Sequence, residues 1–181
     1  MSPEIFAKEL KQSAPSFEQL SARNLSSEFI DDFIKSYNCI LKTHINLKVI
    51  SNDSMINLIL LYDCSKIEIG IVTFVHEIIE MSDYYQIGNV EQDVLIINKI
   101  SHQVEVLDYT NKNHTIWQCA SNSDNFLQAI LICAKYSTAR IIDPVLVENK
   151  KYTKEAVHLC FEKAGGIDYI DFYKMLLGDF D

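Results

Sequence analysis

The spacing of apolar residues predicts two helices near the N-terminus. Ser2-Pro3-Glu4 places a capping hydroxyl, a proline at the first helical position and an acid in the first turn, which predicts the start of a helix. Pro15 is expected to end this helix. A second helix is expected to follow Ser26, because apolar residues recur every three or four positions over 29–37. The first segment therefore predicts a short helix, and the second an amphipathic one.

The C-terminal half has the same helical spacing. The polar run Ser121-Asn122-Ser123-Asp124 offers several capping side chains before the apolar stretch 126–139, which predicts a buried helix ended by Asp143-Pro144. Two further helices are expected over 152–181, separated by Gly165-Gly166. Helices therefore account for most of the chain after residue 121.

The middle of the chain shows the pattern of strands, and residues 84–109 predict a β-hairpin. The apolar run 94–97 is typical of a buried strand, and Gly88, interpreted as a turn residue with positive φ, lies before it. Val104 and Val106 alternate with polar neighbours, which predicts a second strand with one face in water.

Four other segments are expected to be strands. Alternation of apolar residues indicates strands over 42–50 and over 66–75, and the segment 114–120 fits one more. The apolar segment 55–62 has no clear period, and its length and the polar turn after it favour a strand. Strands followed by helices predict an α+β fold with a central, mostly antiparallel β-sheet flanked by helices.

Length and composition are those of one ordinary domain, assigned to residues 1–181 with a core at about 25–135 and a C-terminal helical part at about 145–181. The chain has 181 residues, of which 48% are hydrophobic and 23% charged. That size is sufficient for an independent core. No membrane-spanning segment or secretory signal is evident, and five cysteines without paired spacing indicate reduced thiols, so we expect a cytoplasmic protein.

The chain is strongly acidic, with a formal net charge of −9. This disfavours nucleic acid as a partner and favours a basic protein. Residues 53–93 carry eight acids against one base, a net charge of −7. This run is interpreted either as a dispersed solvated surface or as an acidic docking surface, for which the candidate partner-binding residues are Glu80, Asp83, Glu91 and Asp93.

The sequence contains no established catalytic, nucleotide-binding or metal-binding motif, so we expect no catalytic residues, no metal and no cofactor. His76-Glu77 is the nearest approach to an acid/base pair, but adjacent residues on a strand point to opposite sides. Trp117 is the single tryptophan and is expected in the core or on a sheet face. A small hydrolase using His76 with a nearby carboxylate or Cys64 is the catalytic alternative.

The hairpin resembles the SUKH superfamily, which includes yeast cell-wall regulators of the Smi/Knr type and many bacterial immunity proteins. The resemblance consists of an Ile-Gly pair, a polar loop ending in Asp, a strand, a turn and a second strand. In order, these are Ile87-Gly88, 89–93, 94–97, 98–102 and 103–108. The segments 25–34 and 120–127 also resemble parts of that family, and the C-terminal helices have no counterpart.

The resemblance implies a binding protein, not an enzyme. It implies an α+β domain that captures a partner on an exposed face, and a bacterial relative would neutralise a cognate polymorphic toxin by occluding its cleft. An acidic inhibitor suits a basic nuclease. The alternative within the same family is a regulatory scaffold that binds partners other than toxins.

Overall fold

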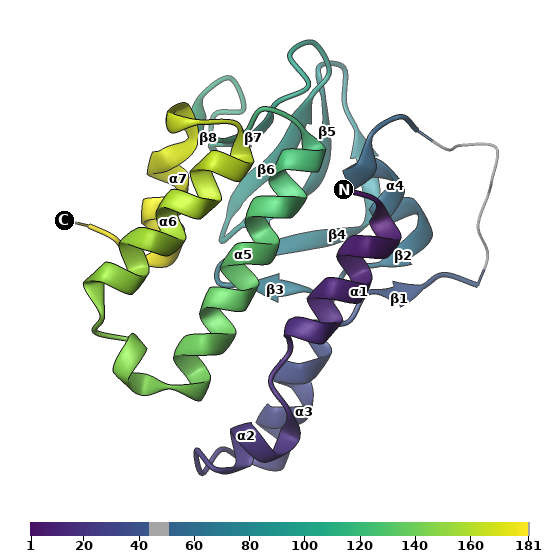
Figure 1. The fold of residues 1–181 in the computed structure, drawn as a ribbon. Coiled ribbons are helices and arrows are strands. Elements are labelled where there is room, and N and C mark those ends of the chain that lie inside the picture. Colours follow the sequence, from purple (N-terminus) through teal and green to yellow (C-terminus); the bar gives the residue numbers. More distant parts are fainter. Residues whose placement is uncertain (44–50, 181) are drawn as a thin grey trace.

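Six strands form an antiparallel sheet in which each strand pairs with the next one in the chain (Figure 1). Its strands are β3 (Glu68–Ile69), β4 (Val72–Glu80), β5 (Tyr84–Val90), β6 (Asp93–Asn98), β7 (Val104–Leu107) and β8 (Thr115–Ala120). The structure is a computed structural model that describes residues 1–43 and 51–180. The predicted α+β class with an antiparallel central sheet is confirmed.

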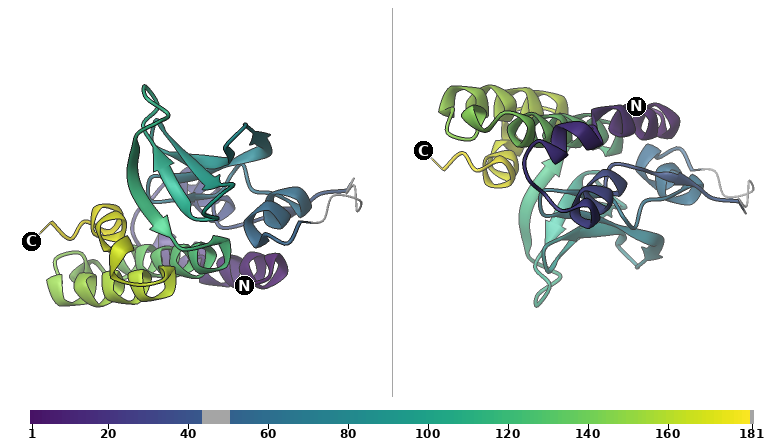
Figure 2. Two further views of the ribbon diagram at one scale, coloured as in Figure 1. Left: turned by 90° about the horizontal axis from the view of Figure 1, so that it is seen from above. Right: turned by 90° about the horizontal axis from the view of Figure 1, so that it is seen from below.

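Helices cover one side of this sheet, which is strongly curled (Figure 2). The helices are α1 (Pro3–Ser13), α2 (Phe17–Ser21), α3 (Ser27–Lys35), α4 (Ser54–Leu61), α5 (Ser123–Ile142), α6 (Lys150–Ala164) and α7 (Ile170–Leu177), with short 3₁₀ turns η2 (Pro144–Leu146) and η3 (Ile167–Tyr169). Helices α1, α5 and α6 lie together in one layer against the sheet. A separate ribbon pairs β1 (Ile40–Leu41) with β2 (Tyr62–Asp63).

The predicted helix starts are confirmed by their caps. The Ser2 hydroxyl accepts a hydrogen bond from the backbone N–H of Ile5 at 3.3 Å, and the Ser26 hydroxyl caps α3 in the same way. Asn122 caps α5, the long buried helix. The helix pair near the C-terminus is separated at Gly165-Gly166 as expected, and Gly165 has a positive φ of 122°.

The strand predicted at 55–62 is wrong, because this segment is helix α4. The Asp53 carboxylate accepts hydrogen bonds from the backbone N–H groups of Met55 and Ile56, at 2.9 and 3.0 Å, and so starts a helix. Met55, Leu58 and Ile59 are buried, and apolar residues also occupy the remaining faces. The helical period was hidden because almost every position is apolar.

The single strand predicted over 66–75 is also wrong in part, because a turn divides it into β3 and β4. Gly70 lies at this turn with a φ of +62°, a conformation that glycine adopts without strain. The predicted strand at 114–120 is confirmed as β8, and Trp117 on β8 is partly buried against the core. Most of the strand expected at 42–50 lies outside the described residues.

The prediction of Gly88 as a turn residue with positive φ is wrong. Gly88 lies within β5, opposite Phe74 of β4, and its φ is not positive. A Cβ atom at this position would lie 2.1 Å from the carbonyl oxygen of Thr73. Gly88 is therefore needed for close approach of two backbones, and the turn follows at Glu91, whose φ is 52°.

The hairpin of β6 and β7 is confirmed, with Ile97 paired to Val104 and Leu95 to Val106. The wet face predicted for β7 is wrong, because Glu105 is only 8% exposed. Its carboxylate accepts hydrogen bonds from side chains of Asn98 and Thr115. Glu105 lies on the face of the hairpin that is turned away from the main core. A small second apolar cluster on the same face explains why the Glu105 side chain is buried, and its residues are Val94, Ile96 and Leu107.

One main core joins the sheet to helices from both ends of the chain. Phe6 of α1 and Phe172 and Tyr173 of α7 belong to the same buried cluster as the sheet residues. The Tyr173 hydroxyl donates a 2.8 Å hydrogen bond to the backbone carbonyl of Cys119. Among the described residues, no helix has both the length and the apolar character needed to cross a membrane.

Candidate functional site

The four predicted partner-binding acids lie in two pairs at opposite ends of β5. Glu80 ends β4 and Asp83 lies in the β4–β5 turn, whereas Glu91 lies in the β5–β6 turn and Asp93 begins β6. A seven-residue strand spans about 20 Å, so the pairs are separated by roughly that length. The structure therefore brings Glu80 near Asp83 and Glu91 near Asp93, and does not bring all four together.

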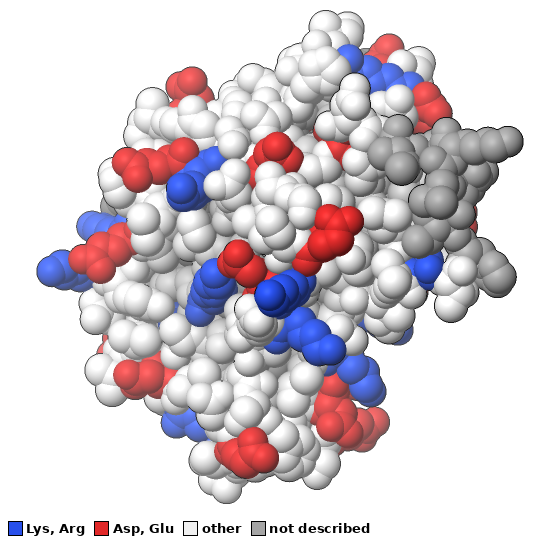
Figure 3. Space-filling view, turned by 45° about the vertical axis from the view of Figure 1, so that its right-hand side comes forward, with Lys and Arg blue, Asp and Glu red and all other residues white. Residues whose placement is uncertain are grey.

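Acidic side chains are not gathered into one continuous field on the face shown in Figure 3. Red and blue side chains alternate over that face. Charges of opposite sign also pair between helices, since Lys135 of α5 lies 3.0 Å from Glu9 of α1. A docking surface on this face must therefore be defined by local groups of residues, and not by the net charge alone.

The end of the molecule that holds Glu80 and Asp83 is built by two turns held together by Lys99. Its backbone N–H donates to the carbonyl oxygen of Asp83 at 2.9 Å. Its ammonium group donates to Glu80 Oε1 at 2.8 Å and to the carbonyl oxygen of Met81 at 2.6 Å, and lies 4.5 Å from the centre of the Tyr85 ring. These contacts fix the β4–β5 turn against the β6–β7 turn.

We name this region the hairpin end, defined by residues 79–83 and 98–102. Large apolar side chains are exposed there: Ile100 is 87% exposed, Ile79 48% and Met81 45%. The Glu80 side chain is 67% exposed although Lys99 pairs with it, and the Lys99 side chain is 23% exposed. The hairpin end thus offers carboxylates and apolar groups to solvent together.

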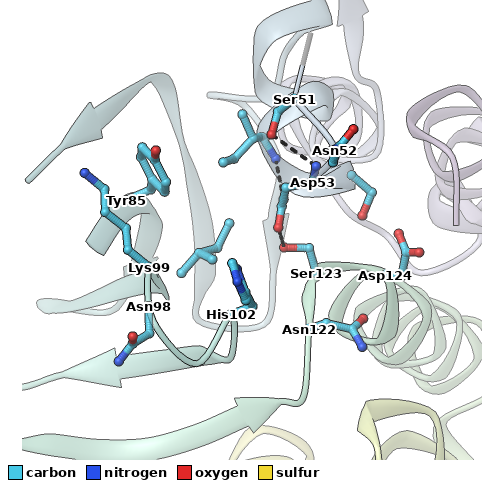
Figure 4. Close-up of a pocket in the computed structure, with 13 residues that line it drawn as sticks. Ser51, Asn52, Asp53, Tyr85, Asn98, Lys99, His102, Asn122, Ser123 and Asp124 are labelled. Carbon is cyan, nitrogen blue, oxygen red and sulfur yellow. Dashed lines mark hydrogen bonds between the residues drawn. The ribbon is translucent and has the colours of Figure 1, made fainter. Parts of the chain in front are cut away.

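A pocket of about 490 Å³, named the polar pocket because most residues that line it are polar, opens beside the hairpin end (Figure 4). Its walls come from the start of α4, the start of α5 and the β6–β7 turn, which supplies Lys99 and His102. His102 lies in the left-handed region with a φ of 60°, and its ring is directed into the pocket. Asp124 on the α5 side lies 3.0 Å from the amino group of Met1.

Asp53 joins the two helices that form one wall of this pocket. One carboxylate oxygen caps α4, and the other accepts a hydrogen bond of 2.7 Å from the Ser123 hydroxyl at the start of α5. Sequence reasoning missed this arrangement. The signal was present locally, since Asp53-Ser54 before an apolar run is a helix start pattern, but the link to Ser123 spans 70 residues.

His76 is paired with a carboxylate, but not with Glu77, its neighbour in the sequence. His76 Nδ1 lies 3.0 Å from Asp63 Oδ1, and the His76 side chain is 59% exposed. Burial alone would raise the pKa of Asp63, but hydrogen bonds from Ser65 and His76 outweigh it and lower this pKa to about 2. The pair is a solvated contact between β2 and β4.

Cys64 adjoins this pair in the sequence, but it is buried. Its contact with the Cys39 thiol and its burial raise the pKa of Cys64 far above the usual value, which disfavours the nucleophilic thiolate. Cys133 and Cys160 also contact each other, with 3.6 Å between their sulfur atoms, and all five cysteines are buried free thiols. These contacts are consistent with cysteines used for packing.

In residues 1–43 and 51–180, no group of three or more His, Cys, Asp or Glu side chains is placed to hold a metal ion. The polar pocket and the hairpin end offer hydrogen-bond donors, acceptors and charges, which suit recognition of another molecule.

Comparisons with protein-family models, with curated proteins and with solved structures found no match to this chain.

Proposed function

We propose that this protein is a non-catalytic binding domain that captures a cationic protein at the hairpin end. The observation that carries the proposal is the exposure of Glu80 and Asp83 beside the apolar side chains of Met81 and Ile100. Apolar anchors supply affinity in protein interfaces, and charged residues around them steer the encounter and select the partner. A net charge of −9 favours a basic partner for the same reason.

The class of partner rests on the resemblance of the central hairpin to the SUKH superfamily. We propose a cognate bacterial toxin, such as a basic nuclease, whose substrate cleft this protein would occlude with carboxylates placed where phosphates otherwise bind. A cytoplasmic location belongs to the same proposal, and the five free thiols support it. No residue of this chain performs chemistry in this scheme.

The functional test is co-expression of this protein with the toxin candidate encoded beside it, followed by affinity capture. We expect growth to be rescued and a complex to be recovered. Absence of both rescue and complex would refute the immunity proposal. Stable recovery of a partner without toxic activity, and no rescue, would instead indicate a regulatory scaffold.

The placement of the surface is tested by charge reversal at the two ends of β5. Glu80→Lys with Asp83→Lys is expected to slow association with the toxin about 10-fold or more at low salt, and to weaken its salt dependence. Glu91→Lys with Asp93→Lys is the matched control, because it changes the net charge equally at the other end. A larger effect from the control variant would contradict this placement.

A further inference from the structure

One edge of β4 has no partner strand over its second half. On that side, β3 pairs only with Val72 and Thr73. Within the described residues, no other strand pairs with this edge, since β5 lies on the other side and β1 pairs with β2. An irregularity in the β4–β5 ladder precedes Ile79, and regular pairing resumes there. The end of β4 therefore leaves a short open edge.

The direction of the backbone groups follows from the pairing with β5. Met81 donates its backbone N–H to the carbonyl oxygen of Tyr84 at 2.9 Å, so Met81 faces β5. Neighbouring residues of a strand direct their N–H and C=O groups to opposite sides. The N–H of Glu80 and the carbonyl oxygens of Ile78 and Glu80 consequently point outward, and in the described part of the chain these groups have no hydrogen-bond partner outside the β4–β5 ladder.

The side chains along this edge follow a symmetric order, with two apolar residues between two acids. The sequence is Glu77-Ile78-Ile79-Glu80, and all of these residues except the half-buried Ile78 are exposed. Two copies of a chain with a net charge of −9 repel each other, and the exposed carboxylates of Glu77 and Glu80 favour a cationic strand at this edge.

We propose that the cationic partner adds an extended segment as a new strand along residues 77–80 of β4. This inference rests on the proposed function and specifies how the hairpin end binds. Main-chain hydrogen bonds to Ile78 and Glu80 supply affinity that is independent of sequence, and alternating side chains supply specificity. The segment that fits has apolar residues flanked by Lys or Arg, which oppose Glu77 and Glu80.

The decisive experiment compares Glu80→Pro with Glu80→Ala in binding to the toxin candidate used above. Both variants lose the carboxylate, but only proline also removes the outward N–H, and proline is tolerated on an open sheet edge. We expect Glu80→Pro to bind at least 10-fold more weakly than Glu80→Ala, since a hydrogen bond is lost and the ring obstructs pairing. Circular dichroism verifies that both variants fold.

Hydrogen exchange on the wild-type protein provides a second measurement that requires no variant. On complex formation, exchange of the Glu80 amide is expected to slow by at least 10-fold. Equal binding of the two variants, with unchanged exchange at the Glu80 amide, would overturn strand addition and leave capture intact. Failure of the wild-type protein to bind would overturn the proposed function, and this binding mode with it.

Discussion

Substitution of Gly88 by alanine tests the close contact between β4 and β5. The added Cβ would lie 2.1 Å from the carbonyl oxygen of Thr73, whereas contacts under 3.0 Å essentially do not occur. The two strands must therefore separate by about 1 Å at this pair. Atoms forced into a packed site cost about 1–3 kcal/mol, and the contact here is with backbone, which cannot rotate away.

We expect Gly88→Ala to lower the free energy of unfolding by about 2–3 kcal/mol. The smaller conformational freedom of alanine in the unfolded chain, worth at most about 1 kcal/mol, offsets part of a larger native-state cost. For a chain of this size, the melting temperature should fall by about 4–12 °C. Urea denaturation followed by circular dichroism gives the free energy directly.

Gly88→Asn distinguishes close approach from a need for positive φ. Asparagine tolerates the left-handed region better than alanine, so a positive-φ site would accept it with the smaller loss. At a site of close approach, the larger side chain should cost at least as much as alanine. A loss below 1 kcal/mol for Gly88→Ala, or a clearly milder effect of asparagine, would refute the interpretation.

Three further changes test local interactions. Tyr173→Phe leaves the buried carbonyl of Cys119 without its donor, and we expect a loss of about 1–2 kcal/mol in urea denaturation. Asp53→Ala removes the cap of α4 and the partner of the Ser123 hydroxyl, so the free energy of unfolding is expected to fall by about 1–3 kcal/mol. Asp53→Asn should cause a smaller loss, because asparagine can also cap a helix. The lowered pKa of Asp63 contributes stability that is complete above about pH 4 and is lost as pH falls towards 2. In Asp63→Asn, the free energy of unfolding should fall by roughly 1 kcal/mol less than in the wild type over this pH range, after allowance for solvent screening. Acid titration of both proteins measures this difference.

The features predicted correctly from the sequence depend on contacts between near neighbours. Ser2, Ser26 and Asn122 each accept a hydrogen bond from the backbone N–H three residues later, so their role as helix caps is visible in a short stretch of sequence. The β6–β7 hairpin is equally local, because one turn joins its strands. Segment 55–62 failed because apolar residues on nearly every face remove the periodicity that separates helix from strand.

The rest depends on contacts that no local pattern encodes. Gly88 is required because Thr73 lies against it, and the pocket exists because Asp53 meets Ser123 across 70 residues. The candidate acids were identified by charge alone, and their division between two ends of β5 appears only once the strands are paired. Lys99 could not be selected from the sequence, since its role is to join two turns.

The order of strands in the sheet has a consequence for the route by which the chain folds. Each strand of β3–β8 pairs with its neighbour in sequence, so the sheet can form through a series of short loop closures. Helix α1 instead meets α5 across more than one hundred residues, as the Lys135–Glu9 pair shows. We therefore expect the meander to assemble early and α1 to dock in a late step, which makes the N-terminal helix the first element to detach when the protein is stressed.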